Sequence, residues 1–329
     1  MPTRRIAEDL YSDRYPDRSS ITTEPLVSIV VPAYFSASII EDCLKSLSSQ
    51  KYLKENLEVI VIDSGNDETK DICRKYDVQY YHSARKLSAG AARNMGAEIA
   101  KGQILAFIDA DCVAPNQWIW NLINDFDEFP EAFGVLGVYE GGKSNLDKVR
   151  GGELMECKKR IDFHRGFIEG NVAFRRKVFE KGCRFGDMTY GECVKLSVEL
   201  SKMGMKTVWD PALRVFHKGH LTYRKMFAMD RAYARTSLGL ENGALTKGLL
   251  KLLYITILLV SIPFCPLLAV SLALTLFAVM AAYSLSDNMV SSKHRVNYIH
   301  ILIAMRLSRF FASAIEAFLH LLKGGKLDD

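Results

Sequence analysis

The chain has 329 residues, enough for one large domain and an appendage, and it carries 43 Lys and Arg against 38 Asp and Glu. Because acid nearly balances base and no face alternates aromatic with basic residues, we expect no nucleic-acid partner. Seven scattered cysteines without a C-x-x-C pair fit neither a disulfide framework nor a structural zinc site, which favours a reducing compartment. Residues 1–25 are polar and hold no apolar stretch that could act as a secretory signal, so we expect this end in the cytosol.

Short apolar runs alternate with helical stretches from residue 26 onward, which is typical of a parallel sheet covered by helices on both faces. Strands are expected at 27–32, 57–63, 78–82, 104–109, 133–139 and 170–175. Helices are expected at 39–47, 69–75, 89–100, 118–129 and 193–203. The stretch 140–160 is rich in Gly and charge, and we expect a mobile loop over the site there.

Two of the predicted strands end in an aspartate, Asp63 and Asp109. In such sheets ligands bind at the carboxyl ends of the strands, so both side chains are candidates for a binding site. A dinucleotide-binding fold would carry G-x-G-x-x-G after its first strand, whereas this chain has Pro32-Ala-Tyr-Phe-Ser-Ala37. A phosphate group must therefore be bound by a structural feature other than a Gly-rich loop.

The motif Asp109-Ala-Asp111 follows an apolar run, which places both carboxylates where a buried strand emerges. Two such carboxylates repel each other unless a cation lies between them and a ligand. A divalent ion that bridges Asp111 and a diphosphate meets this condition, and Mg²⁺ and Mn²⁺ prefer such oxygen ligands. The alternative is a pair of solvated carboxylates in a loop.

Six motifs follow one another along the chain: Val27-Ser-Ile-Val-Val-Pro-Ala-Tyr34, Val59-Ile-Val-Ile-Asp-Ser-Gly65, Gly90-Ala-Ala-Arg-Asn-Met-Gly96, Phe107-Ile-Asp-Ala-Asp111, Gly170-Asn-Val-Ala-Phe-Arg175 and Tyr190-Gly-Glu192. Their order closely resembles the family 2 glycosyltransferases of GT-A fold, over about residues 26–220. The resemblance implies an inverting enzyme with a nucleotide-sugar donor. Two alternatives stay open: a non-catalytic membrane-bound nucleotide-sugar-binding protein, and a nucleotidyltransferase, which usually carries a Gly-rich basic loop after the first strand.

Carried over to this chain, the resemblance implies a nucleotide site at the ends of the first strands. Pro32, Ala33 and Tyr34 would surround the base and ribose, and Asp63 would hydrogen-bond the base. Arg93 would support the nucleotide from the helix that begins at residue 89. The alternatives are a turn or helix cap for Asp63 and a surface ion pair for Arg93.

The resemblance also implies a metal site, in which Asp111 binds the ion directly and Asp109 faces ribose and metal. His217 lies just after a strand, where some relatives place a ligand of the metal or the diphosphate, and His220 follows three residues later. An isolated histidine is more often structural, so this reading stays open for both.

The general base is expected at Glu192. Relatives usually carry Glu-Asp there, where this chain has Glu192-Cys193, and a thiol is a poor substitute for the carboxylate. Asp187 is the nearby reserve. A further departure is Phe35-Ser36, where the family commonly has Asn-Glu.

The stretch 249–286 is almost wholly apolar and much too long for one crossing of a hydrocarbon core about 30 Å thick. Pro263 and Pro266 mark a break, which predicts two helices at 246–262 and 267–286 that cross the membrane and return. A buried hairpin in a soluble core is the alternative.

Basic residues lie before and after this hairpin and none at its turn, so the positive-inside rule places both ends and the catalytic domain in the cytosol. A segment at 298–322 is amphipathic, and we expect it to lie on the membrane or to pack against the catalytic domain. The basic run at 224–235 suits lipid headgroups or an anionic acceptor equally. The hairpin favours a lipid-linked or cell-envelope glycan as acceptor. The expected organisation is a polar segment 1–25, a GT-A domain 26–237 and a membrane-associated region 238–329.

Overall fold

The computed structural model describes residues 25–151, 159–161, 170–188, 190–240, 243–286 and 297–323. These residues form two compact units. The first holds the described residues of 1–142 and 158–219, and the second those of 143–157 and 220–329.

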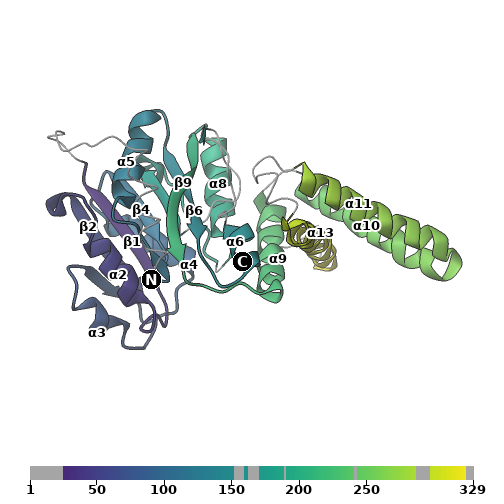
Figure 1. The fold of residues 1–329 in the computed structure, drawn as a ribbon, viewed down its shortest axis with the longest axis horizontal. Helices are drawn as coiled ribbons and strands as arrows, with labels where there is room; N and C mark the ends of the chain where they lie inside the picture. Colours follow the sequence, from purple (N-terminus) through teal and green to yellow (C-terminus); the bar gives the residue numbers. More distant parts are fainter. Residues whose placement is uncertain are drawn as a thin grey trace. The chain divides into compact units, whose positions relative to one another are not determined.

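The first unit is built on one sheet with the strand order β3-β2-β1-β4-β8-β6-β9-β5, and β7 pairs with β9 outside this path (Figure 1). The strands are β1 Val27–Ala33, β2 Leu57–Asp63, β3 Gln79–His82, β4 Ile104–Ile108, β5 Cys112–Val113, β6 Gly134–Glu140, β7 Arg160–Ile161, β8 Asn171–Arg175 and β9 Thr207–His217. The helices are α2 Ile40–Ser48, α3 Thr69–Cys73, α4 Ala89–Ile99, α5 Trp118–Glu128, α7 Lys177–Glu180 and α8 Glu192–Lys202, with a 3₁₀ turn at Lys54–Asn56. This arrangement confirms the expected α/β architecture.

Most strands of the sheet run in one direction. Strands β3, β2, β1 and β4 are all parallel, as expected. Beyond them β8 is antiparallel to both β4 and β6, while β6 and β9 are parallel. Because β8 is antiparallel to both of its neighbours, β6 and β9 run in the same direction as β4, and the expectation of a mainly parallel sheet is confirmed. Strands β5, β7 and β8 run in the opposite direction, because apolar patterning predicts a strand but not the direction in which a connection returns it.

Helices cover both faces of this sheet. Helix α2 buries Ile40, Cys43, Leu44 and Leu47, the spacing of a single apolar stripe, and packs with α5 against one face of β1. On the opposite face four aromatic rings form a cluster with centroid separations of 5.0 to 6.3 Å, made by Phe107, Phe174, Phe179 and Phe185. Both faces of the sheet are thus covered at β1 and β4.

The buried side chain of Asn171 in β8 links strands β6 and β9 to helix α5. The Asn171 side-chain amide donates to the carbonyl oxygens of Val138 at 2.8 Å and Leu213 at 2.9 Å. Its oxygen accepts from the indole nitrogen of Trp118 at 2.9 Å. All polar atoms of a fully buried amide are therefore satisfied, which fixes β6 and β9 against α5.

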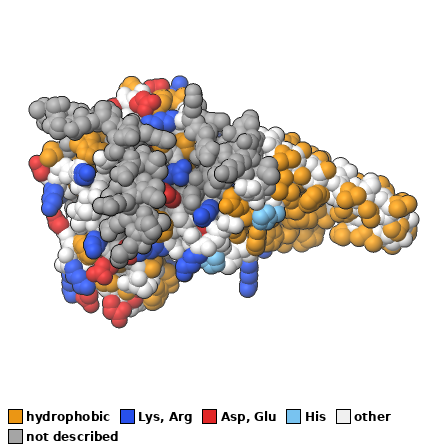
Figure 2. All heavy atoms as spheres, viewed as in Figure 1, with side chains coloured by type: hydrophobic (Ala, Val, Ile, Leu, Met, Phe, Trp, Pro, Cys, Tyr) orange, Lys and Arg blue, Asp and Glu red, His pale blue; other side chains and the backbone are white. Residues whose placement is uncertain are grey.

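The second unit consists of helices. They are α6 Asn145–Gly151, α9 Tyr223–Leu240, α10 Ala244–Phe264, α11 Pro266–Leu285 and α13 Ile299–Leu322. The two predicted hairpin helices are confirmed as α10 and α11, which meet at Cys265, and both are long and apolar enough to cross a membrane. Their apolar side chains are mostly exposed, as the orange surface over this hairpin shows (Figure 2), unlike those of a hairpin buried in a soluble core.

The expectation for the stretch 140–160 needs correction. The stretch 140–160 is not simply a mobile loop, because β6 runs to Glu140 and α6 occupies 145–151; residues 152–158 lie outside the described part. Helix α13 packs on α9 and α10, and Glu316 within it is buried. The reason is that arginines of α9 pair with it across the helix contact.

Candidate active site

The two aspartates of the Asp109-Ala-Asp111 motif lie in the turn that joins β4 to β5. All five residues of β4 are buried, so the carboxylates emerge at the end of a rigid strand. Strand β5 then pairs antiparallel with the end of β9, with Cys112 opposite His217. This pairing places Asp111 Oδ2 3.3 Å from His217 Nε2.

Tyr139 joins the histidine to the other aspartate. Its ring stacks on His217 with 4.4 Å between centroids and 7° between planes. Its hydroxyl donates a hydrogen bond of 2.5 Å to Asp109 Oδ2. Sequence reasoning missed Tyr139, although it ends a predicted strand at the same edge of the sheet as the aspartates. It is the structure that shows its side chain facing the site.

Arg93 bridges two carboxylates that lie far apart in the sequence. Its Nη2 is 2.5 Å from Asp109 Oδ1 and its Nη1 is 2.8 Å from Glu192 Oε1. The Arg93 side chain is only 3% exposed, so this is a buried bridge rather than a surface ion pair. Contact between Arg93 and a nucleotide stays a prediction.

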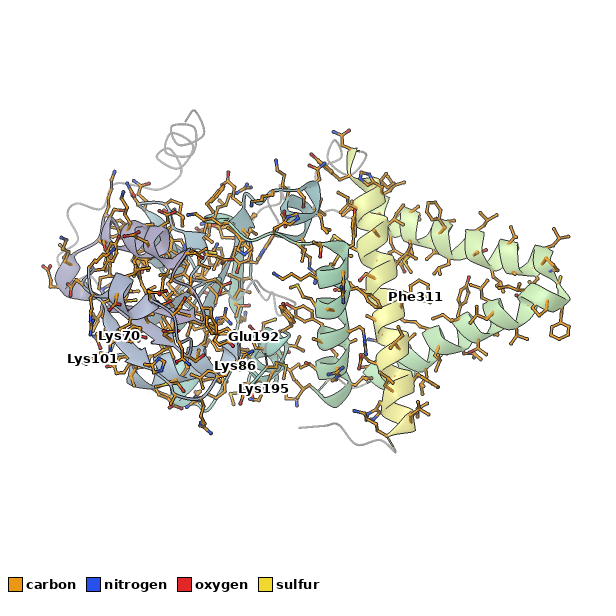
Figure 3. The ribbon with its side chains drawn as sticks, turned by 90° about the horizontal axis from the view of Figure 1, so that it is seen from below. Lys70, Lys86, Lys101, Glu192, Lys195 and Phe311 are labelled. Carbon is orange, nitrogen blue, oxygen red and sulfur yellow. The ribbon has the colours of Figure 1, made fainter. Side chains whose placement is uncertain are left out.

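Glu192 (Figure 3) begins α8 directly after Gly191. Gly191 has a φ of +86°. The Glu192 side chain is 5% exposed in its pair with Arg93, and Cys193 beside it is fully buried. Asp187, the reserve base, is nearer the surface and accepts a 2.6 Å hydrogen bond from the Ser88 hydroxyl. The structure thus brings Glu192 to the same cluster as the aspartates, while Asp187 is held by the residue that caps α4.

Asp111, Cys112 and His217 each offer a ligand atom within 4.8 Å of the others, a group that could hold a metal ion. Burial, and next the charges of Asp109 and Asp111, raises the pKa of the Cys112 thiol well above its usual value. A thiol binds metal as the thiolate, so Asp111 and His217 are the better pair of donors. His220 lies in the second unit, where its Nδ1 is 3.3 Å from Asp147 Oδ2.

A glycine leaves room for the Tyr139–Asp109 hydrogen bond. A Cβ atom on Gly170 would lie 2.2 Å from both Asp109 Oδ2 and the Tyr139 hydroxyl. Any other residue at this position would push one of the two side chains away. The Gly-Asn motif at 170–171 therefore serves the site through its missing side chain and through the buried amide that follows it.

Exposed aromatic rings follow β1. Tyr34 and Phe35 are 44% and 56% exposed, and their rings meet edge to face at 4.7 Å. Lys86 Nζ lies 4.6 Å from the centre of the Tyr34 ring. Phe35 has a φ of +50°, which costs a non-glycine residue on the order of 1–2 kcal/mol. Such strain is common at ligand-binding sites, and the family's Asn would relieve it. Pro32 and Ala33 precede these rings at the end of β1.

Asp63 is fully buried at the end of β2. Its Oδ1 accepts from the Gly65 backbone N–H at 2.8 Å and its Oδ2 from the Tyr80 hydroxyl at 2.7 Å. Burial, and then this hydrogen bond, raises the pKa of Tyr80. The structure thus gives Asp63 the turn-stabilising role that was its alternative, and its contact with a nucleobase stays a prediction.

Residues 28–183 match the family model described as "Glycosyl transferase family 2". The glycosyltransferase AglE of Haloferax volcanii is 39% identical over 104 residues, 30% of this chain and 34% of that protein. The glycosyltransferase GlyG of Streptococcus pneumoniae is 31% identical over 120 residues, 35% of this chain and 39% of that protein. The chain thus spans about a third of the length of the curated relatives it matches.

Solved structures resemble the fold over nearly the whole chain. The mannosyltransferase PcManGT of Pyrobaculum calidifontis, in complex with GDP-Man and Mn²⁺, has a TM-score of 0.56 at 17% identity and covers 99% of this chain and 95% of that one. S. aureus TarS 1-349, in complex with UDP-GlcNAc, has a TM-score of 0.50 at 15% identity, with 92% and 93% covered. At this identity the likeness shows the fold, which is GT-A.

Proposed function

We propose that this protein, whose residues 28–183 form a family 2 glycosyltransferase domain, transfers a sugar from a nucleoside-diphosphate sugar to a hydroxyl or phosphate acceptor. One observation carries the proposal. Asp109, Asp111 and His217 meet at the end of a buried strand, and Arg93 links them to Glu192. These are the groups that transfer of a glycosyl unit needs: ligands for an ion that faces the diphosphate, and a carboxylate that can accept a proton.

The donor set fits a divalent cation. Asp111 and His217 are the residues that would hold the ion, with Asp109 fixed behind them by Arg93 and Tyr139. Mg²⁺ takes oxygen ligands, so an imidazole nitrogen beside a carboxylate favours Mn²⁺, the ion named with the mannosyltransferase of similar fold. When bound, the ion supplies Lewis-acid stabilisation of the departing diphosphate.

The nucleotide is proposed to lie over the end of β1. Tyr34 and Phe35 present exposed rings on which a base can stack, and Lys86 adds positive charge beside them. Pro32 and Ala33, at the end of β1, are proposed to line the bottom of this nucleotide site. The sugar is then proposed to lie between these rings and Glu192. Lys86 and Glu192 both belong to the first unit (Figure 3).

Glu192 is the proposed general base. A neighbouring guanidinium favours the carboxylate form of a glutamate, which is the form a base must start from. The same pairing with Arg93 weakens the base, since the proton must compete with the guanidinium. In the proposed step the acceptor hydroxyl passes its proton to Glu192 and attacks the anomeric carbon from the face opposite the nucleoside diphosphate, with inversion. Asp187 is the alternative base, because it is nearer the surface.

The exposed α10–α11 hairpin is proposed to insert into a membrane, with the catalytic unit on the cytoplasmic side. A membrane-bound enzyme shares its surface with a lipid acceptor, so we propose a lipid-linked or cell-envelope glycan as acceptor. The non-catalytic alternative, a nucleotide-sugar-binding protein, is favoured only by Cys193 in place of an acid. The loop after β1 lacks the Gly-rich basic sequence of a nucleotidyltransferase.

Donor turnover tests the proposal. The purified full chain is offered UDP-, GDP- and dTDP-sugars with Mn²⁺ or Mg²⁺ and a membrane lipid extract, and released nucleoside diphosphate is measured. We expect metal-dependent release from one donor, lost in Asp111→Ala and kept in Asp71→Ala, which removes a 65% exposed carboxylate from the first turn of α3. Metal-dependent donor binding without release in the wild type would favour the non-catalytic alternative.

A further inference from the structure

The chain leaves strand β9 through Lys218 and Gly219, beside the proposed metal ligands. Strand β9 pairs with β5 up to His217. The Lys218 backbone N–H then donates to the Asp111 carbonyl oxygen at 3.0 Å, and its ammonium group pairs with Asp42 of α2. This segment is therefore tied to the same backbone that carries Asp111, which fixes where residue 219 lies.

Gly219 has no room for a side chain. A Cβ atom on it would lie 2.2 Å from His217 Cε1, 2.6 Å from His217 Nε2 and 3.1 Å from Asp111 Oδ2. Carbon atoms in contact are about 3.5–4.0 Å apart, so the imidazole would have to move by about 1 Å or more. The φ of Gly219 lies outside the left-handed region, so the backbone conformation itself does not require glycine. Glycine is required here because of space.

The His217 ring is not free to move aside. It stacks on the Tyr139 ring with 4.4 Å between centroids and 7° between planes. Tyr139 is held in turn by its hydrogen bond to Asp109, for which Gly170 leaves the space. The imidazole is thus confined by the Tyr139 ring and by the backbone of Gly219.

This confined position is the one that a bound ion needs. His217 Nε2 lies 3.3 Å from Asp111 Oδ2. Octahedral ligands about 2.1 Å from an ion lie about 3.0 Å from each other, so these two atoms can bind one ion with little movement. Both are among the three atoms that a side chain on Gly219 would meet first. The space that this glycine leaves therefore lies next to the two donor atoms.

We propose that Gly219 is a positioning residue of the metal site, whose missing side chain keeps the His217 imidazole beside Asp111. Gly219 acts through the imidazole and needs no contact of its own with the ion. The inference rests on the proposed function, because it assumes that Asp111 and His217 hold the divalent ion. It gives a residue without any functional group a role in metal affinity.

Binding of Mn²⁺ to the full chain in detergent measures this role without sugar transfer. Free Mn²⁺ gives an electron paramagnetic resonance signal that is lost on binding, so a titration yields Kd. We expect Gly219→Ala to raise Kd about 10- to 100-fold, the usual effect of losing a residue that orients a metal ligand. The matched control is Gly239→Ala, which adds the same methyl group to an exposed glycine of α9 and should leave Kd unchanged.

A double variant separates crowding of the imidazole from a change in the backbone. His217→Ala removes the ring and weakens Mn²⁺ binding by itself. In that background Gly219→Ala should have little further effect on Kd, because there is no ring left to displace. A further loss as large as that in the wild-type background would overturn the proposal, since Gly219 would then act through the backbone.

Thermal melting shows whether each variant is folded. If Gly219→Ala does not fold, crowding predicts that the added His217→Ala restores folding, and an unfolded double variant would overturn the proposal. An unchanged Kd in folded Gly219→Ala would also overturn it and leave the proposed metal site intact. A wild type that binds no Mn²⁺ would instead contradict the metal site itself, and this inference with it.

Discussion

The Tyr139 ring lies parallel to the His217 ring at 4.4 Å, and the Tyr139 hydroxyl holds Asp109 by a hydrogen bond. One side chain thus fixes both the imidazole that is proposed to bind the metal and the carboxylate behind it. Because a stacked ring restricts rotation of the imidazole, Tyr139 is a positioning residue for the metal site.

Tyr139→Phe separates these two roles. It removes the hydroxyl and keeps the stacked ring, so we expect turnover to fall about tenfold, the size of one lost hydrogen bond to a charged group, with little change in the Mn²⁺ concentration for half-maximal rate. Tyr139→Ala should raise that concentration as well. Steady-state rates over a Mn²⁺ titration give both quantities, and an equal Mn²⁺ dependence of the Ala and Phe variants would contradict the positioning role.

Arg93→Met should destabilise the first unit strongly. The substitution leaves Glu192 and Asp109 without their shared cation, and an uncompensated buried charge costs about 3 kcal/mol. Urea unfolding measures the loss. Arg74→Met, at an exposed pair with Asp71, is the control and should change the free energy of unfolding by less than about 0.5 kcal/mol. A small effect at Arg93 would show that the carboxylates do not depend on this bridge.

Asp125 predicts a pH dependence of stability. Burial, and next the charge of Asp210, raises the pKa of Asp125 to about 7 against the opposing pull of Lys159. The folded chain then binds a proton that the unfolded chain releases near pH 4, so the free energy of unfolding should fall as pH rises from about 4 to about 7.

Asp125→Asn removes the group responsible, so its melting temperature should vary less over this window than that of the wild type. A melting series from acid to neutral pH makes the comparison, with Asp71→Asn as the exposed control. Equal slopes in the wild type and Asp125→Asn would mean that the carboxylate titrates outside this range.

Gly248 sets the distance between α10 and α13. A Cβ at this position would lie 2.6 Å from the Ala317 Cβ and 2.9 Å from the Ser313 carbonyl oxygen. Gly248→Ala should therefore cost about 1–3 kcal/mol through overpacking, although alanine favours a helix more than glycine does. Thermal melting in detergent is the measurement, and a raised melting temperature would show that the helices can move apart freely.

Most of the strands, the hairpin helices and the aspartates of the site could be predicted from the sequence, because each depends on a pattern of neighbouring residues. Apolar runs such as β4 and the hairpin helices are long enough for their patterns to be read, and the carboxyl ends of strands meet at one edge, which brought Asp109, Asp111 and His217 together. Strand β5 has two residues, too few for any periodicity.

The contacts that complete the site could not be predicted in this way. Arg93 and Glu192 are 99 positions apart and meet only because α4 and α8 pack on the same face of the sheet. A tyrosine at the end of a strand is typical of core packing, so the sequence did not indicate that Tyr139 belongs to the site. The burial of Glu316 could not be predicted either, because periodicity describes one helix, while this burial depends on arginines from another.

Transfer of the sugar itself is the most direct test of the central claim. The wild type and Asp111→Asn are incubated with the active donor, Mn²⁺ and a membrane lipid extract, and the mass gained by the lipids is compared with the nucleoside diphosphate released. We predict equal amounts of the two products in the wild type and neither in Asp111→Asn, with the fold of the variant intact. Undiminished transfer by Asp111→Asn, or a wild type that binds donor and yields no product with any acceptor lipid, would contradict the account.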